Sequence, residues 1–219
     1  MVKAAGPTAA LAGVPAGIQS QGVWAGRRQM FVRFAAEAET ATMYTPDALG
    51  SEIKRQSGRS VFHSISICGR DALANSEFLA AAFEKFTPTV PVMLDTDGQR
   101  PEAIGELKKY VKLVQATIDF GGPDALVDRV LKTLGAAATA GTHHALVLTP
   151  RDETSDSQLL RLIEQVHAAS AETIVVIHPM VGAERGSLDR RWSTLLELVG
   201  PVHSDVRVLL RVPPPAGMK

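Results

Sequence analysis

Leu113–Leu148 reads LVQATIDFGGPDALVDRVLKTLGAAATAGTHHALVL, and this stretch is the clearest indication of the fold class. It begins and ends with short apolar runs, at 113–118 and 143–148, which are typical of strands. Between these runs lies a helical pattern that we expect to end at Gly135, with apolar residues at Leu126, Val127, Val130, Leu131 and Leu134. A strand, a helix and a second strand in this order predict a β–α–β unit with two parallel strands.

The same alternation continues on both sides of this unit. A second helical pattern runs from Leu159 to Val166, and further strands are predicted at 29–34, 60–67, 90–94, 173–177 and 206–210. Strands that are apolar on both faces predict an α/β fold in which helices cover a mostly parallel sheet. Periodicity alone leaves open whether this sheet is doubly wound or forms a barrel or partial barrel. The glycine-rich motifs of dinucleotide and nucleoside-triphosphate folds are absent from the sequence, which disfavours both.

Length and composition suit a single domain at 18–219 behind a flexible leader at 1–17, which is rich in Ala, Gly and Pro. The chain has 23 basic and 23 acidic residues, so it has no overall field to attract phosphates, and we do not expect a nucleic-acid partner. No window approaches the roughly 18 uninterrupted apolar residues of a membrane span. A single cysteine, Cys68, fits a reducing cytoplasm.

The opening of the domain, IQSQGVWAGRRQMFVRFA at 18–35, resembles the start of the 7-carboxy-7-deazaguanine synthases, a branch of the radical S-adenosylmethionine (SAM) enzymes. The next residues in that family carry Cys-x3-Cys-x2-Cys, whose thiolates hold a 4Fe–4S cluster. The corresponding positions here are Glu37, Ala41 and Tyr44, and alanine and tyrosine cannot replace thiolates. The resemblance therefore implies an open partial (β/α)6 barrel, similar to a TIM barrel, without a 4Fe–4S cluster or SAM cleavage. SAM itself remains a candidate ligand.

Further motifs of the family recur in order at the predicted strand ends. The family's Gly-Gly-Glu-Pro-Leu, which holds the SAM amino group, corresponds to GRDAL at 69–73, and its Glu-Thr-Asn-Gly corresponds to DTDG at 95–98. Its Val-Asp-x-Lys region falls on TIDF at 117–120, and its Asp-Val-Arg-Val strand is DVRV at 205–208. Carried over to this sequence, the resemblance implies ligand-binding roles for Gln19, Gln21, Arg33, Gly69, Asp71, Asp95, Asp97 and Asp119.

Arg33 has the most specific role among these candidates, because the family's arginine at this position meets the substrate carboxylate. We expect its guanidinium to point into the barrel mouth, within reach of Gln19 or Gln21. An ordinary ion pair is the alternative. Arg70 could instead pair with an acid at 95–98 and close the mouth. Each strand-end acid could also simply cap the helix that follows it.

His178 follows the predicted strand at 173–177 and is the best pocket candidate among the six histidines, although a histidine without a catalytic role also fits. No His-x3-His or Cys-x2-Cys spacing occurs, so no metal site is predicted. Without a metal to order it, the loop 36–44 is expected to be mobile or bound to a partner. No residue is assigned a catalytic role.

Three functions fit these observations. The first is a cluster-less relative of the radical SAM enzymes that binds a small carboxylate-bearing or pterin-like ligand, or serves as a non-catalytic subunit in a cofactor or modified-nucleoside pathway. The second is an enzyme that performs acid–base chemistry in the same pocket. The third is a structural partner protein whose pocket has closed. A homodimer or a hetero-oligomer with a partner enzyme is expected.

Overall fold

The computed structural model describes residues 6–120, 124–179 and 185–209. Its ten strands form one sheet in the order β10-β9-β8-β7-β6-β5-β3-β1-β4, and β2 also pairs with β3. The strands are β1 (Ala9–Gly13), β2 (Ala16–Ile18), β3 (Arg28–Phe34), β4 (Thr42–Tyr44), β5 (Ser64–Gly69), β6 (Val92–Thr96), β7 (Val111–Asp119), β8 (His143–Thr149), β9 (Ile174–Ile177) and β10 (Val206–Val208). The helices are α1 (Pro46–Ser57), α2 (Ser76–Lys85), α3 (Ile104–Leu107), α4 (Asp124–Thr139), α5 (Asp156–Ala169) and α6 (Arg185–Val199), with short 3-10 turns η1 (Ala72–Asn75) and η2 (Pro101–Ala103).

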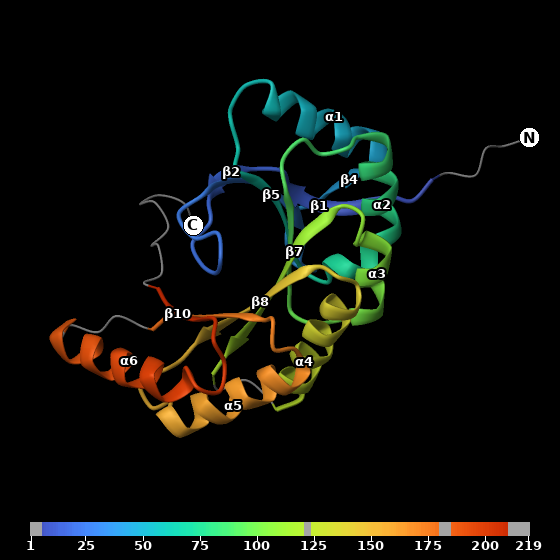
Figure 1. The fold of residues 1–219 in the computed structure, drawn as a ribbon. Helices are drawn as coiled ribbons and strands as arrows, with labels where there is room; N and C mark the ends of the chain where they lie inside the picture. Colours follow the sequence, from blue (N-terminus) through green and yellow to red (C-terminus); the bar gives the residue numbers. More distant parts are fainter. Residues whose placement is uncertain (1–5, 121–123, 180–184, 210–219) are drawn as a thin grey trace, which may run out of the picture.

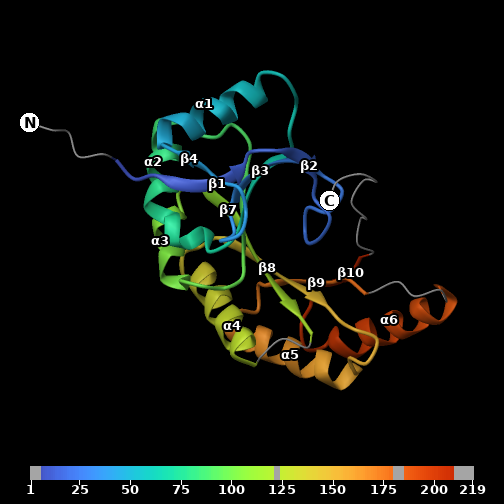
Figure 2. The ribbon, with the colours of Figure 1, turned by 180° about the vertical axis from the view of Figure 1, so that it is seen from behind.

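The strand order identifies the fold as an open partial barrel. Strands β3 and β5–β10 are parallel, and they neighbour one another in the same order as along the chain. A doubly wound sheet would reverse this order at a switch point. Right-handed crossovers that all advance in one direction place their helices on one face of the sheet, as Figures 1 and 2 show. In the described part of the chain, β10 and β4 end the sheet without pairing to each other, so the barrel is not closed.

The predicted (β/α)6 architecture is therefore confirmed, with a seventh parallel strand, β10, after the sixth β–α unit. The apolar core lies between the sheet and its helices. Met30 and Val32 of β3 belong to the same buried cluster as Phe83 of α2. Leu146 of β8 and Leu159 of α5 belong to a second cluster farther along the sheet.

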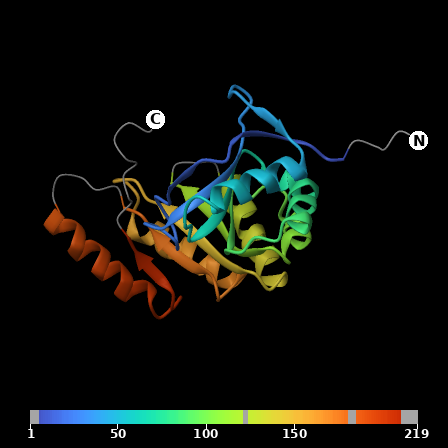
Figure 3. The ribbon, with the colours of Figure 1, turned by 90° about the horizontal axis from the view of Figure 1, so that it is seen from above.

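The inner face of the sheet is polar on three strands, which corrects the expectation of strands apolar on both faces. Between the core positions stand Gln29 on β3, Ser64 and Ser66 on β5, and Gln115 on β7, all with no exposed surface. The loop between β2 and β3, residues 19–27, lies over this face (Figures 1 and 3). Polar side chains are tolerated here because they face this loop and one another rather than the helices.

Two further expectations were wrong. Residues 9–17 are not a flexible leader, because β1 and β2 pair with β3 in the sheet; residues 1–5 lie outside the described part. Helix α4 does not end at Gly135 but continues to Thr139. Alanines 136–138 follow Gly135 and are the strongest helix formers, and the left-handed backbone conformation comes only at Gly141, with φ +71°.

The other predicted strands are confirmed with shifted ends, and β5 begins at Ser64 rather than at residue 60. Part of the loop 36–44 forms strand β4, which pairs with β1. In the described part of the chain, no helix combines the length and apolar composition that crossing a membrane requires.

Candidate ligand-binding site

Four side chains form a row across the inner face near the carboxyl ends of the strands. Arg33 pairs in register with Cys68, and Asp95 pairs with Gln115. Cys68 and Asp95 follow Ile67 and Leu94, which are themselves paired, so the two halves of the row adjoin. We call this set the inner row: Arg33, Cys68, Asp95 and Gln115. The mouth of a parallel barrel is where such folds place their chemistry.

Burial controls the electrostatics of the inner row. It raises the pKa of Asp95 from 3.8 to about 6, and the carboxamide of Gln115 on the neighbouring strand partly offsets this rise. Burial also raises the pKa of the Cys68 thiol to about 12; the Asp95 charge adds to this effect and the Arg33 charge opposes it. Asp95 can therefore exchange a proton near neutral pH, whereas Cys68 stays a neutral thiol.

The β2–β3 loop binds the same region of the sheet through its backbone. The Gly22 amide donates to Nε2 of His178 at 2.8 Å, and the Val23 amide donates to Oε1 of Gln115 at 3.3 Å. The Gln21 side chain donates to Oγ1 of Thr117 at 3.4 Å. The loop thus brings the predicted residues Gln21 and His178 together with Gln115, which the sequence did not single out.

Several polar atoms under and beside this loop have no hydrogen-bond partner in the described part of the chain. They are Nε2 of Gln19, Oε1 of Gln29 and Oγ of Ser66, all buried. An unpaired buried polar atom costs about 1–3 kcal/mol, so several in one region point to a partner such as water or a polar ligand.

Arg33 and Arg70 are both paired with acids of the loop that replaces the cluster loop. Arg33 binds Glu39, and Arg70 lies 3.0 Å from Glu37. The alternative of an ordinary ion pair therefore describes Arg33, which is half exposed. Arg70 pairs with Glu37 instead of following the other alternative, an ion pair with Asp95 or Asp97. Exposed pairs of this kind contribute only about 0–1 kcal/mol each.

Three predicted acids lie outside the inner row. Asp71 has a left-handed backbone, with φ 45°, and accepts from Arg100 at 3.2 Å. Asp97 is exposed and accepts from the Gln99 amide within its own turn. Asp119 is exposed and accepts from the Thr149 hydroxyl. None of these contacts brings these acids to Asp95.

Gly69 has a structural role at its strand end. Its φ is +99°, and a Cβ there would lie 2.2 Å from the carbonyl oxygen of Phe34. The space that a side chain on Gly69 would need is therefore occupied by the backbone of the neighbouring strand β3.

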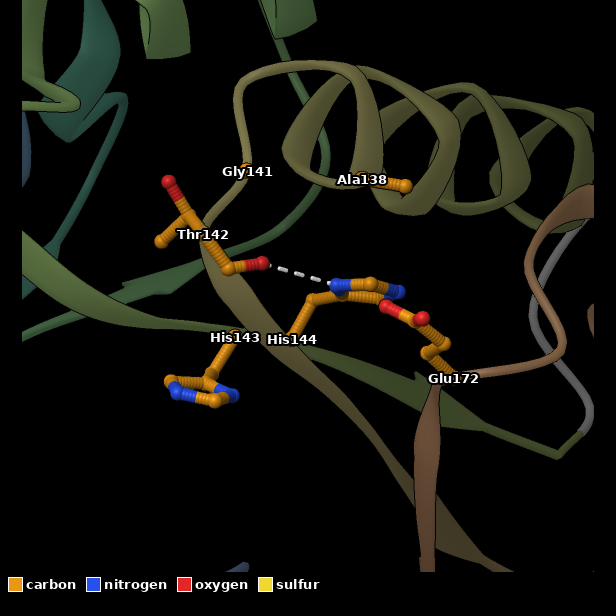
Figure 4. A pocket seen from close by; sticks show the side chains of 6 residues that line it. All are labelled: Ala138, Gly141, Thr142, His143, His144 and Glu172. Carbon is orange, nitrogen blue, oxygen red and sulfur yellow. Dashed lines mark hydrogen bonds between the residues drawn. The ribbon is translucent and has the colours of Figure 1, made fainter.

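Two hollows lie at the opposite end of the strands. One, of about 140 Å³, is lined by residues that include His143, His144 and Glu172 (Figure 4). Both ring nitrogens of His144 are engaged there, with the Thr142 carbonyl at 2.9 Å and Oγ of Ser170 at 2.7 Å. The other, of about 350 Å³, is lined by residues 87–91 with Lys109, Tyr110 and Lys112. Over the described ranges, no three His, Cys, Asp or Glu side chains are grouped so as to hold a metal ion.

Comparison with known proteins assigns no family: no family model and no curated protein matches the sequence. Among solved structures, a type I 3-dehydroquinate dehydratase from Clostridium difficile superposes with a TM-score of 0.45 at 7% identity, over 74% of this chain and 70% of that one. A 3-keto-D-glucoside 4-epimerase from E. coli superposes with a TM-score of 0.40 at 12% identity, over 84% of this chain and 92% of that one. Both scores are low, so the fold assignment rests on the strand order, and neither activity is carried over.

A signal for the missed residues was present in the sequence. In β5 and in the second half of β7, polar residues alternate with apolar ones, as in the SIS of 64–66 and the QAT of 115–117. Period-two alternation predicts one polar face.

Proposed function

We propose that the chain is a cluster-less relative of the 7-carboxy-7-deazaguanine synthases that binds a small carboxylate-bearing or pterin-like ligand at the inner row, without cleaving SAM. The inner row carries this proposal, because it combines a partly buried acid whose pKa is about 6 with an amide and a guanidinium at a barrel mouth. A cytoplasmic location and a partner subunit belong to the same proposal.

The residues do not fit a 4Fe–4S cluster. Such a cluster needs several thiolates, and the whole sequence has one cysteine, whose thiol pKa is about 12. Two acids of the replaced loop, Glu37 and Glu39, instead pair with arginines. No step of the proposed function therefore depends on iron.

The ligand would meet complementary groups along the inner row. The Asp95 carboxylate accepts from ring N–H groups, and Nε2 of Gln115 donates to a ring carbonyl, which together suit the amino-pyrimidinone edge of a pterin. A ligand carboxylate would take the place of Glu39 on Arg33. Replacing the Glu39 carboxylate by that of the ligand costs little free energy, because an exposed ion pair is weak.

Two pairs of variants test this function by thermal shift with pterin-6-carboxylate, unsubstituted pterin and SAM. At a hundredfold excess over the dissociation constant, a ligand stabilises the folded state by about 2.7 kcal/mol, which raises the melting temperature by about 5–10 °C. Asp95→Asn should lose the response to both pterins, whereas Asp97→Asn should keep it. Arg33→Ala should lose only the extra response to the carboxylate, whereas Arg70→Ala should keep it. No response to any of the three compounds in the unmodified protein would refute the proposal.

The acid–base enzyme is the second candidate, favoured by the raised pKa of Asp95. It would convert the bound ligand, with a rate that depends on pH near 6 and is abolished in Asp95→Asn. The structural-partner function would instead give no small-molecule response together with stable capture by another subunit.

A further inference from the structure

We propose that the β2–β3 loop, residues 19–27, is a lid that must lift before a ligand reaches the polar inner face, and that Gly22 is the residue that allows it to close. The ligand in this statement rests on the proposed function, but the lid movement is tested without one.

The lid fits the inner face closely at one position. A Cβ on Gly22 would lie 1.8 Å from Oε1 of Gln115 and 2.7 Å from its Nε2. Gly22 is buried, and its amide reaches His178 from this position. A side chain at this position would force the Gln115 carboxamide to move, and the φ of +78° also favours glycine.

The lid covers polar groups on the inner face of the sheet. The Gln115 carboxamide lies directly below Gly22 and is close enough to Asp95 to lower its pKa. Oγ of Ser66 is on the same face and is buried without a hydrogen-bond partner in the described part of the chain. Val23 and Trp24 pack against the buried residues Met93 and Leu113 on that face. A ligand that used these polar atoms would need this loop to move.

The lid is built as a separable unit. It is closed at its base, where the Gln19 amide donates to the Arg27 carbonyl at 2.9 Å and the Gly26 amide donates to the Gln19 carbonyl at 2.8 Å. A turn within it joins the Arg27 amide to the Trp24 carbonyl at 3.1 Å. The loop can therefore keep its shape while its contacts to His178 and Gln115 break. Segments held by few contacts open at lower free energy than the core.

Trp24 provides a reporter of lid position. Its ring meets that of His63 edge-on, with centroids 5.2 Å apart. The chain has two tryptophans, so Trp192→Phe leaves Trp24 as the only one. When the lid lifts, Trp24 loses this contact and enters water, which shifts its emission to longer wavelength.

Gly22→Ala and Gly26→Ala form a matched pair in this background. Both glycines have φ +78°, but a Cβ on Gly26 meets nothing within 4 Å. We expect Gly22→Ala to shift the Trp24 emission and to raise hydrogen exchange at the Val23 amide about tenfold, the effect of losing one hydrogen bond. Gly26→Ala should change neither. If the two variants had the same Trp24 emission and the same hydrogen-exchange rate at the Val23 amide, the lid proposal would be refuted.

A second variant guards against misfolding of Gly22→Ala. Gln115→Met removes the acceptor of the Val23 amide at similar side-chain volume. This variant should show the same increase in hydrogen exchange at Val23 while it unfolds in urea as the unmodified protein does. Unchanged exchange would count against the lid. Pterin-6-carboxylate should associate at least about tenfold faster with Gly22→Ala than with Gly26→Ala, by the same loss of one hydrogen bond. If the emission shifts but no variant binds pterin, the lid stands and the proposed function fails. If both variants bind pterin at equal rates and the emission does not shift, the proposed function stands and the lid fails.

Discussion

Replacing Asp95 by Asn is expected to stabilise the protein at neutral pH and to leave its stability unchanged in acid. Burial raises the pKa of Asp95 from 3.8 to about 6, so the folded state keeps this proton at pH values where the unfolded chain has lost it. The folded state thus binds more protons between these values, and the free energy of unfolding falls as pH rises through this window. Asp95 hardly lowers the free energy of unfolding below about pH 4, and it lowers it most above about pH 6.

The magnitude follows from the two pKa values. The difference between 3.8 and about 6 corresponds to about 3 kcal/mol. This is a large share of the roughly 5–15 kcal/mol that stabilises a typical domain. A partly buried acid kept at such a cost is typical of a functional site.

Urea unfolding at about pH 4 and about pH 8 measures this effect directly. Asp95→Asn should gain up to about 3 kcal/mol at the higher pH and only about 0.6 kcal/mol at the lower one. Asp97→Asn is the control, because Asp97 is exposed and Asn retains the oxygen that accepts from the Gln99 backbone amide, losing only the exposed contact with the Gln99 side chain. A gain of equal size at both pH values, or no gain at the higher one, would refute burial as the cause.

Two further predictions concern the strand ends of β3 and β5. Gly69→Ala should lower the free energy of unfolding in urea by about 3–5 kcal/mol, since a Cβ would meet the Phe34 backbone at 2.2 Å. Gly141→Ala, with φ +71° and open space, should lower it by only about 1–2 kcal/mol. Similar losses in the two variants would contradict the steric argument. The Cys68 thiol, with a pKa of about 12, should react with a disulfide reagent at about pH 8 at least a hundredfold more slowly than the urea-unfolded chain, and Asp95→Asn should speed this reaction. A fast reaction in the folded protein would show that the thiol is not shielded.

The sequence predicted the elements of the site better than their contacts. His178 was singled out because it follows a strand, and it does meet a loop residue on the inner face. Gln115 was missed, although its polar side chain stands in an otherwise apolar strand. Arg33 was expected near Gln19 or Gln21, but its partner is Glu39, six residues along the chain. Motif spacing predicts that a residue lies at a strand end, but it does not predict which of the nearby charged groups the residue pairs with.

Three features follow from the amino-acid sequence alone: the parallel strands, the helices between them and the absence of cluster thiolates. They depend on local periodicity and on residue identity, which hold whatever the rest of the chain does. Three others required the folded chain: β1 and β2 join the sheet, Gly22 packs on Gln115, and Asp95 holds its proton to about pH 6. Each of these depends on desolvation or on close approach between segments that are distant in sequence, and local sequence patterns do not predict such contacts.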